Sequence, residues 1–138
     1  MDKIMIAYDG STHSFASIEE VKKLKKGFPL VKIVILHVTD IADLKDQALS
    51  LSDDAKVRKY HREQKIKEEL AGLLDEEEYT IELLYGDPAT EILGHIKKNP
   101  TDLLVLGTRG LNAIQEFVMG SVSHKVVKYA TVPVLIVK

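Results

Sequence analysis

The stretch DLLVLGTRGLNAIQEFVMGS, residues 102–121, runs from an apolar segment through a loop to a turn of small residues. The apolar run 103–106 has the length and composition of a buried strand. Three of the chain's eight glycines follow it, at Gly107, Gly110 and Gly120. Glycine allows the backbone to bend sharply and to bring its N–H groups close to another group. The stretch therefore predicts a strand, a loop and the start of a helix.

The alternation of strand and helix continues on both sides of this stretch. Short apolar segments predict strands at 3–8, 31–38, 79–85, 103–106 and 133–137. Amphipathic spacing predicts one helix that follows residues 9–12 and stops at Gly27, and others at 53–74, 89–98 and 120–129. Residues 39–50 are poorly patterned and are expected to form a loop or lid. Such alternation predicts one doubly wound α/β domain over residues 1–138, with a five-stranded parallel sheet and helices on both faces.

The composition limits the classes of function. The chain has no cysteine, which excludes disulfides, thiolate catalysis and cysteine-based zinc sites and agrees with a cytoplasmic location. The formal net charge is -2 and no segment is one-sidedly basic, so nucleic acid is not expected as a partner. No apolar run approaches the roughly 20 residues that cross a bilayer, and the chain begins directly with a strand-like run. We therefore expect neither a membrane span nor a signal peptide.

The residues that follow the predicted strands are the candidate ligand-binding residues, because open α/β sheets bind ligands beyond the carboxyl ends of their strands. A helix that opens at Gly120 and Ser121 offers unpaired N–H donors and the positive end of its dipole to an anion. Ser121 and Ser123 add hydroxyl groups, and Arg109 adds a permanent cation. These features favour a polyphosphate site, although the spacing matches neither the P-loop motif nor the G-x-G-x-x-G fingerprint.

The glycine spacing also carries a family resemblance. Gly107, two residues, Gly110, nine residues, and then Gly120-Ser121 match the signature of the nucleotide-binding branch of the universal stress proteins. The opening IAYDGS (6–11), the segment VILHV (34–38) and the ending VPVLIV (132–137) are also similar to that family. The resemblance covers nearly the whole chain.

The resemblance implies an ATP site, a strand order and a dimer. Its residues would be Ala7, Tyr8 and Asp9 at the adenosine end, Val38 meeting adenine through its backbone, Gly107, Gly110 and Arg109 beside the ribose and phosphates, and Gly120, Ser121, Val122 and Ser123 around the phosphates. Mg²⁺ or Mn²⁺ would bridge the phosphates. The implied strand order is 3-2-1-4-5, and the implied homodimer pairs the last strand, Val132 to Val137. An apolar terminal edge strand independently favours a partner.

Each of these residues also has an ordinary structural interpretation. Gly107 and Gly110 could serve only as loop glycines. Ser121 could be a helix N-cap, Asp9 could cap a helix or shape its turn, and Arg109 could be a surface cation. The five histidines lack metal-ligand spacing. His37, at a strand end, is expected to be packed or hydrogen-bonded.

Four functions remain open on the sequence alone. The first is a small ATP-binding stress-response regulator that switches with its nucleotide and hydrolyses it slowly at most. The alternative within the same fold is a nucleotide-independent dimeric interaction module. A phosphoacceptor receiver is suggested by Asp9, Asp87 and Thr108 at strand ends, with Lys138 at the end of the last strand. A flavodoxin-like FMN protein is suggested by the Ser/Thr-rich loop 11–14.

Overall fold

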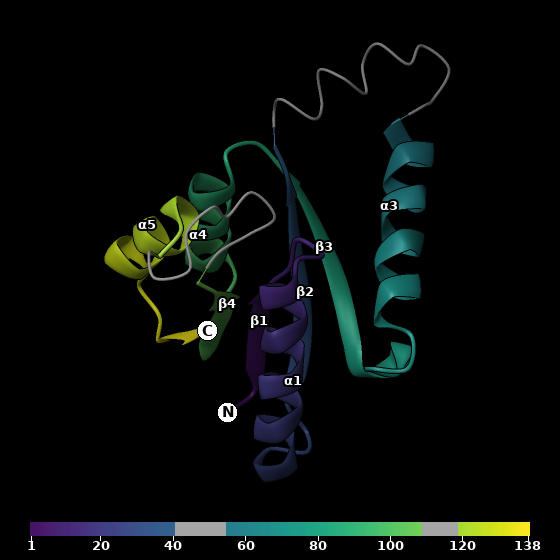
Figure 1. Ribbon diagram of the computed structural model, residues 1–138, viewed down its shortest axis with the longest axis horizontal. Helices are drawn as coiled ribbons and strands as arrows, with labels where there is room; N and C mark the ends of the chain where they lie inside the picture. The colour runs from purple at the N-terminus through teal and green to yellow at the C-terminus, as the bar shows by residue number, and fades with distance from the viewer. Residues whose placement is uncertain (41–54, 109–118) are drawn as a thin grey trace.

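The sheet is parallel, five-stranded and ordered β3-β2-β1-β4-β5 (Figure 1). The computed structural model describes residues 1–40, 55–108 and 119–138. The strands are β1 (Lys3–Ala7), β2 (Lys32–Thr39), β3 (Tyr79–Tyr85), β4 (Leu103–Gly107) and β5 (Val134–Val137). The predicted fold class and strand order are confirmed.

The helices cover both faces of this sheet, as the doubly wound prediction requires. They are α1 (Thr12–Gly27), α3 (Ala55–Leu70), α4 (Pro88–Lys98) and α5 (Ser121–Tyr129), with the short 3₁₀ turn η1 (Glu76–Glu78) before β3. Helices α1 and α3 pack on one face, and α4 and α5 pack on the other (Figure 1). Helix α3 ends four residues earlier than the predicted 74, because Gly72 adopts a positive φ of 83° and turns the chain.

Local hydrogen bonds fix where two of the helices begin. Ser11 is the N-cap of α1, and its hydroxyl accepts the Ser14 N–H at 3.2 Å. Asp87 is the N-cap of α4, and its carboxylate accepts the Thr90 N–H at 3.0 Å, with Pro88 in the first turn. Each cap satisfies a backbone donor that a helix start leaves unpaired, a contribution of about 1 kcal/mol.

The apolar core has two halves, one on each face of the sheet. Alternate residues of β1 serve opposite halves: Ile4 and Ile6 pack with α1 and α3, and Met5 packs with α4 and α5. Each fully buried isoleucine contributes about 2 kcal/mol. The central strands therefore pack against helices on both faces. The loops at their carboxyl ends follow directly from these buried strands.

Candidate functional site

The candidate site lies where the strand order reverses, at the carboxyl ends of β1 and β4. Ile6 of β1 pairs with Val105 of β4, so the residues that follow the two strands emerge side by side. Tyr8 and Asp9 follow β1, and Gly107 ends β4. The crevice at such a reversal is the usual ligand position in open α/β sheets. The register thus brings the first predicted residues, Ala7 to Asp9, next to Gly107, the first glycine of the motif.

The loop after β1 is held by Asp9. Its Oδ1 accepts the Ser11 N–H at 2.9 Å and the Ser14 hydroxyl at 2.6 Å, and its own N–H donates to Ser14 Oγ at 3.0 Å. Gly10 completes the turn with a φ of 82°, a conformation that side-chain-bearing residues rarely adopt. The exposed Asp9 therefore shapes the turn before α1, whose N-cap is Ser11, and its position at the sheet edge is as predicted.

Tyr8 joins this loop to helix α3. Its side chain is 3% exposed, and its hydroxyl donates to Glu69 Oε2 at 2.7 Å. Burial and this hydrogen bond raise the pKa of the Tyr8 phenol far above its ordinary value, so the group stays protonated and remains a donor. A Cβ at Gly10 would lie 3.2 Å from the same Glu69 oxygen. The carboxylate of Glu69 is thus bonded to the loop at Tyr8 and lies near Gly10. The sequence, which indicated only a solvated charged helix, did not reveal this contact.

Val38 presents main-chain groups at the same edge. β1 ends at Ala7, whose partner on β2 is Leu36, and the last bond between the strands runs from Tyr8 N–H to Leu36 C=O at 2.9 Å. Thr39 C=O accepts the Gly86 N–H on the opposite side, towards β3. Because successive residues of a strand direct their main-chain groups to alternate sides, the N–H and C=O of Val38 point past the end of β1. This is the main-chain position that the predicted role of Val38 requires.

Gly107 has a packing role of its own. A Cβ at this position would lie 2.4 Å from the Cβ of His13 and 3.2 Å from its carbonyl carbon. The first turn of α1 therefore passes directly over the end of β4, and only glycine leaves room for it. This contact accounts for the first glycine of the motif without a ligand.

The carbonyl of Thr108 ties the start of α5 to the end of β4. It accepts the Gly120 N–H at 2.7 Å and the Ser123 hydroxyl at 2.6 Å. Ser123 is buried, and its hydroxyl also lies 3.0 Å from the Gly120 carbonyl. The helix start is thereby fixed at the switch point, although the Ser123 hydroxyl is already hydrogen-bonded within the protein.

The N-terminus of α5 has no side-chain cap. The helix begins at Ser121 and its N-cap is Gly120, which corrects the interpretation of Ser121 as the cap. Glycine carries no side-chain acceptor, so the first N–H groups, those of Ser121, Val122 and Ser123, are left without the bond that Ser11 and Asp87 supply in α1 and α4. Ser121 is exposed and Val122 is half-buried. An anion is the natural partner of such a helix end.

Two predicted site residues, Arg109 and Gly110, lie outside the described residues. So does most of the predicted loop or lid at 39–50. Its first residue, Thr39, belongs to β2 and is buried.

A polar cluster on the α3 side of β2 was also not expected. His37 and Thr39 stand on the face that carries α1 and α3, since their neighbours Ile33 and Ile35 belong to that half of the core. Burial, with a contribution from the nearby Arg62, lowers the pKa of His37. Within the part of the chain that the structure describes, His37 Nδ1 and Thr39 Oγ1 have no hydrogen-bond partner. The interpretation of His37 as packed is correct, but the described residues supply no hydrogen bond to its Nδ1.

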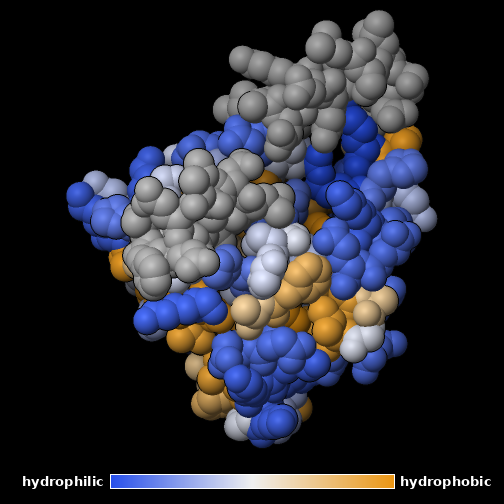
Figure 2. All heavy atoms as spheres, in the orientation of Figure 1, coloured by the Kyte–Doolittle hydropathy of each residue, from blue (hydrophilic) through white to orange (hydrophobic). Residues whose placement is uncertain are grey.

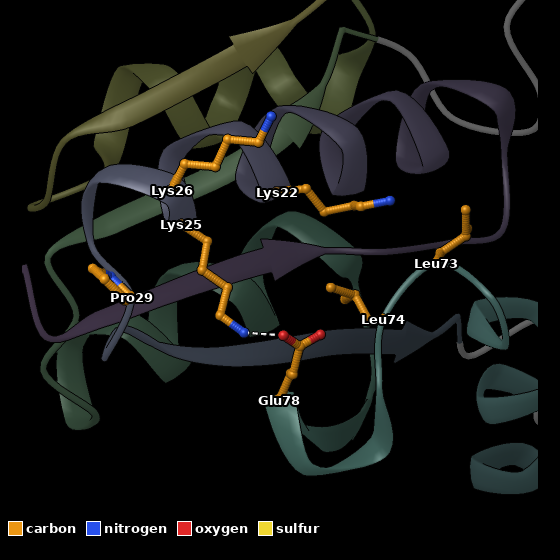
Figure 3. Close-up of a pocket in the computed structure, with 7 residues that line it drawn as sticks. All are labelled: Lys22, Lys25, Lys26, Pro29, Leu73, Leu74 and Glu78. Carbon is orange, nitrogen blue, oxygen red and sulfur yellow. Dashed lines mark hydrogen bonds and ion pairs between the residues drawn. The ribbon is translucent and has the colours of Figure 1, made fainter.

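A separate hollow of about 250 Å³ lies at the opposite edge of the sheet (Figure 3). It is formed by the last turns of α1 and the chain before β3, and its lining residues are Lys22, Lys25, Lys26, Pro29, Leu73, Leu74 and Glu78. Lys25 and Glu78 form an ion pair across it, and the Lys25 ammonium lowers the pKa of the Glu78 carboxyl. Its place at the amino ends of β2 and β3 separates it from the switch point.

Two of the alternatives from the sequence are excluded by the strand order. Receivers and flavodoxins have the order 2-1-3-4-5, whereas this sheet has β2 between β1 and β3. Asp87, which follows β3, is therefore two strands away from Asp9, about 10 Å at ordinary strand spacing. Its carboxylate caps α4, and its hydrogen bonds to Thr90 lower its pKa. The two aspartates do not form an acidic pocket.

Residues 1–40, 55–108 and 119–138 contain neither a group of metal-ligating side chains nor a membrane-spanning helix. No three His, Asp or Glu side chains of these segments are grouped so that they could hold a metal ion. None of their helices has the length and apolar character to cross a bilayer.

The order of strands defines a doubly wound α/β protein, a fold in which ligands are usually bound beyond the carboxyl ends of the strands. Comparison with known proteins identifies the family. The model of the Universal stress protein family matches residues 1–138, and the chain belongs to that family.

Individual relatives extend over the whole domain. Universal stress protein YxiE of Bacillus subtilis is 33% identical over 147 residues, covering 99% of each chain. A universal stress protein of Thermus aquaticus is 32% identical over 138 residues, covering 98% of this chain and 97% of its own. The solved structure of MJ0577 of Methanocaldococcus jannaschii superimposes with a TM-score of 0.74 at 25% identity, covering 99% of this chain and 95% of that one.

Some solved structures of this fold contain adenine nucleotides. An Arabidopsis thaliana universal stress protein family protein with AMP bound has a TM-score of 0.67 at 23% identity, covering 100% of this chain and 92% of that one. The universal stress protein from Archaeoglobus fulgidus in complex with dAMP has a TM-score of 0.64 at 18% identity, covering 100% and 98%. At these identities the likeness to this chain is one of fold.

Proposed function

We propose that this protein is a small regulator that binds an adenine nucleotide, with ATP as its main ligand, at the carboxyl edge of β1 and β4. The observation that carries the proposal is the α5 N-terminus, which has a glycine N-cap and is tied by Thr108 to the end of β4. Phosphates would accept hydrogen bonds from the first N–H groups of α5, where the helix dipole is positive. Arg109 and Gly110 would complete the phosphate end, and Mg²⁺ or Mn²⁺ would bind through the phosphates themselves.

The adenosine end of the site would be formed by β1 and β2. Ala7, Tyr8 and Asp9 are at the end of β1, and the main-chain N–H and C=O of Val38 face the space beyond it. A main-chain donor and acceptor on one residue match the N1 and N6 atoms of adenine. The AMP and dAMP complexes of family members with this fold support the choice of an adenine nucleotide.

The output of the protein would be conformational. Tyr8 of the nucleotide loop is hydrogen-bonded to Glu69 of α3, so a ligand that moved the loop would also move the helix. The exposed side of α3 is mostly hydrophilic, which suits a surface that meets a partner transiently (Figure 2). Slow hydrolysis at most is expected, because the sequence has no Walker-type lysine and Asp9 Oδ1 is already bonded to Ser11 and Ser14.

A specific observation favours a second candidate, a dimeric interaction module that binds no nucleotide. Gly107 is explained by its contact with His13, and the Ser123 hydroxyl is bonded to Thr108. In that case the glycine motif would serve packing alone. Both candidates share a homodimer through β5, whose outer edge carries main-chain groups suited to pairing with a second copy.

Nucleotide content of the purified protein separates the two candidates. The protein is denatured directly after purification, and released nucleotides are identified by chromatography and mass spectrometry. The same sample is then titrated calorimetrically with ATP and AMP, with and without Mg²⁺ or Mn²⁺. We expect near-stoichiometric ATP or ADP, or saturable binding of added ATP. No released nucleotide together with no saturable heat would leave the dimeric module as the better account.

A further inference from the structure

The turn between α1 and β2 holds apolar side chains out in the solvent. Leu30 is 94% exposed and Phe28 is 40% exposed. The turn itself is ordered, because the Val31 N–H donates to the Phe28 carbonyl at 3.0 Å and the Val31 side chain is buried in the core. Pro29, between the two exposed residues, restricts the backbone further. The position of Leu30 is therefore set by the fold and does not result from a poorly anchored loop.

Lysines surround this apolar turn. Residues 22–32 contain five lysines and no carboxylate, which corrects the expectation that no segment is one-sidedly basic: Lys22, Lys23, Lys25, Lys26 and Lys32. The dipole of α1 favours cations in its last turn, which accounts for Lys25 and Lys26. It does not account for Lys32, which begins a strand. Clusters of four or more lysines beside apolar residues are typical of surfaces that meet anionic lipids.

The lysines of α1 lie beside the turn and are only partly neutralised. Lys25 and Lys26 line the hollow of Figure 3 together with Pro29. Two glutamates of α1 pair with the lysines three residues further on, and Glu78 pairs with Lys25. The other glutamates of η1 confine the positive charge to the α1 side of the hollow. Within the described part of the chain, the exposed Lys26 and Lys32 form no ion pair, so their charges are available to an anionic surface.

This end of the molecule is also its most remote point from the candidate nucleotide site. The last turn of α1 and the turn to β2 form the lower end of the view in Figure 1, beyond the first residues of the strands. Figure 2 shows hydrophobic and hydrophilic residues side by side there. The switch point lies at the carboxyl ends of β1 and β4, at the other end of the same strands. A surface that covers the α1–β2 turn therefore leaves that site open to solution.

We propose that the α1–β2 turn docks the protein on a bilayer that contains anionic lipids. Phe28 and Leu30 enter the headgroup layer, and the lysines around them lie against lipid phosphates. Lysine suits this depth, because its apolar stem packs beside apolar groups while its ammonium stays at the level of the phosphates. An apolar tip ringed by cations matches a bilayer, which presents acyl chains beneath a layer of negative charge. An acidic protein partner would match the lysines but would also need a pocket for a protruding leucine.

Binding to vesicles tests the docking, and it is measured without nucleotide, so its result does not depend on the proposed function. The protein is sedimented with vesicles of phosphatidylcholine alone or with about 30% phosphatidylserine, an anionic lipid. The variants are Leu30→Ser and the pair Lys23→Gln with Lys26→Gln. Tyr60→Ser and the pair Lys59→Gln with Lys65→Gln are the matched controls, since they alter an exposed apolar residue and two exposed lysines of α3. Thermal midpoints of all variants are compared by circular dichroism.

We expect the wild type to bind only the vesicles with phosphatidylserine. Leu30→Ser and the pair at 23 and 26 should each bind about tenfold more weakly, and both controls should stay within about twofold of the wild type. Raising NaCl from about 0.1 M to about 1 M should release the protein, because the Debye length falls from about 10 Å to about 3 Å. All variants should keep the wild-type thermal midpoint, since the altered side chains are exposed.

A tryptophan at position 30 reports insertion directly. The chain has no tryptophan, so Leu30→Trp carries the only indole fluorophore of the protein. Its emission should shift to shorter wavelength when vesicles with phosphatidylserine are added, because the indole leaves water. Tyr60→Trp, in α3, is the control and should show no shift.

Three outcomes would overturn the proposal. A wild type that binds neither kind of vesicle has no membrane-docking surface, and the lysines then serve an acidic protein or the solvent. Equal binding by Leu30→Ser and the wild type, or an unshifted Leu30→Trp emission, would mean that the turn does not enter the bilayer. A loss of binding in the α3 controls as large as in the variants of the turn would assign the contact to the charge of the whole protein.

Discussion

A side chain at position 107 would collide with helix α1. The Cβ of Gly107→Ala would lie 2.4 Å from the Cβ of His13, and the nearby atoms include His13 backbone, which cannot rotate away. Overpacking of this kind costs about 1–3 kcal/mol. We therefore expect Gly107→Ala to lower the free energy of unfolding by that amount, measured by urea denaturation in the absence of nucleotide.

Gly94→Ala is the matched control for this change. Gly94 lies inside α4, and a Cβ there would have no heavy atom within 4 Å. Alanine in a helix interior is favoured over glycine by roughly 0.5–1 kcal/mol, so this variant should be more stable than the wild type. If Gly107→Ala were as stable as the wild type, α1 would not press on the end of β4, and the glycine would be reserved for a ligand.

For individual residues, the sequence predicted where a residue lies in the fold better than which contacts its side chain makes. Asp9 and Gly107 are at the sheet edge where they were expected, because strand ends can be read from apolar runs. Their bonds to Ser14 and contact with His13 could not be read, since those depend on how α1 sits on the sheet. Likewise, nothing in the local sequence distinguishes Glu69, which reaches Tyr8, from the other charged residues of α3.

Among the elements, α5 differs from α1 and α4 in how it begins. Its N-cap is Gly120, whereas Ser11 and Asp87 cap the other two with side-chain oxygens. Gly120 has φ −62° and ψ 158°, angles that any residue adopts. Backbone conformation therefore does not require glycine here. Among residues 1–40, 55–108 and 119–138 no side chain caps α5, and an uncapped helix end suits an anion.

Gly120→Asp should raise the free energy of unfolding slightly and weaken the binding of ATP. The new carboxylate can accept a first-turn N–H, which adds a few tenths of a kcal/mol to the stability of the free protein. It also occupies the donors and repels phosphate, so we expect ATP to bind about tenfold more weakly or worse. Urea denaturation gives the first quantity and calorimetric titration gives the second.

Lys128→Gln controls for net charge, because it makes the same change of one unit near the last turn of α5. We expect it to leave ATP affinity within about twofold of the wild type, since the helix dipole acts only within the end turns. Equal affinities for Gly120→Asp and the wild type would place the phosphates away from α5 and would contradict the proposed site.

The ends of the helices and strands show which boundaries can be predicted from the sequence and which cannot. The ends of β3 and α4 were predicted to within a residue, because Tyr85 is followed by Gly86 and α4 begins at a capped proline. The end of α3 was not, because Leu73 and Leu74 continue the apolar spacing beyond Gly72. Those leucines still pack against the core, but they do so from the turn that follows the helix.

For the whole molecule, alternation of strands and helices was enough to predict a doubly wound sheet but not its order. Apolar patterning is the same for 3-2-1-4-5 and 2-1-3-4-5, and only the resemblance favoured the first. The order decides which loops meet: it places Asp9 beside Gly107 and keeps Asp87 two strands away. It also makes β5 an edge strand, and an apolar edge strand invites pairing with another chain.

The main chain of β5 shows how that pairing can be tested without unfolding the domain. The carbonyls of Pro133 and Val137 accept bonds from β4, so by alternation the main-chain groups of Val134 and Ile136 face outwards. Ile136→Pro removes an outward N–H and no bond to β4. Proline is tolerated in edge strands for this reason. Leu135→Pro removes an inward N–H and should unfold this part of the sheet.

We expect the wild-type protein to be a dimer by light scattering at micromolar concentration, and Ile136→Pro to be a monomer with a native circular dichroism spectrum. Ile136→Val keeps the N–H and most of the apolar contact, so it should remain dimeric. A monomeric wild type would remove the proposed dimer. A dimeric, folded Ile136→Pro variant would mean that the two copies meet through side chains rather than paired β5 strands, and the exposed Val127 and Tyr129 of α5 would be the surface to alter next.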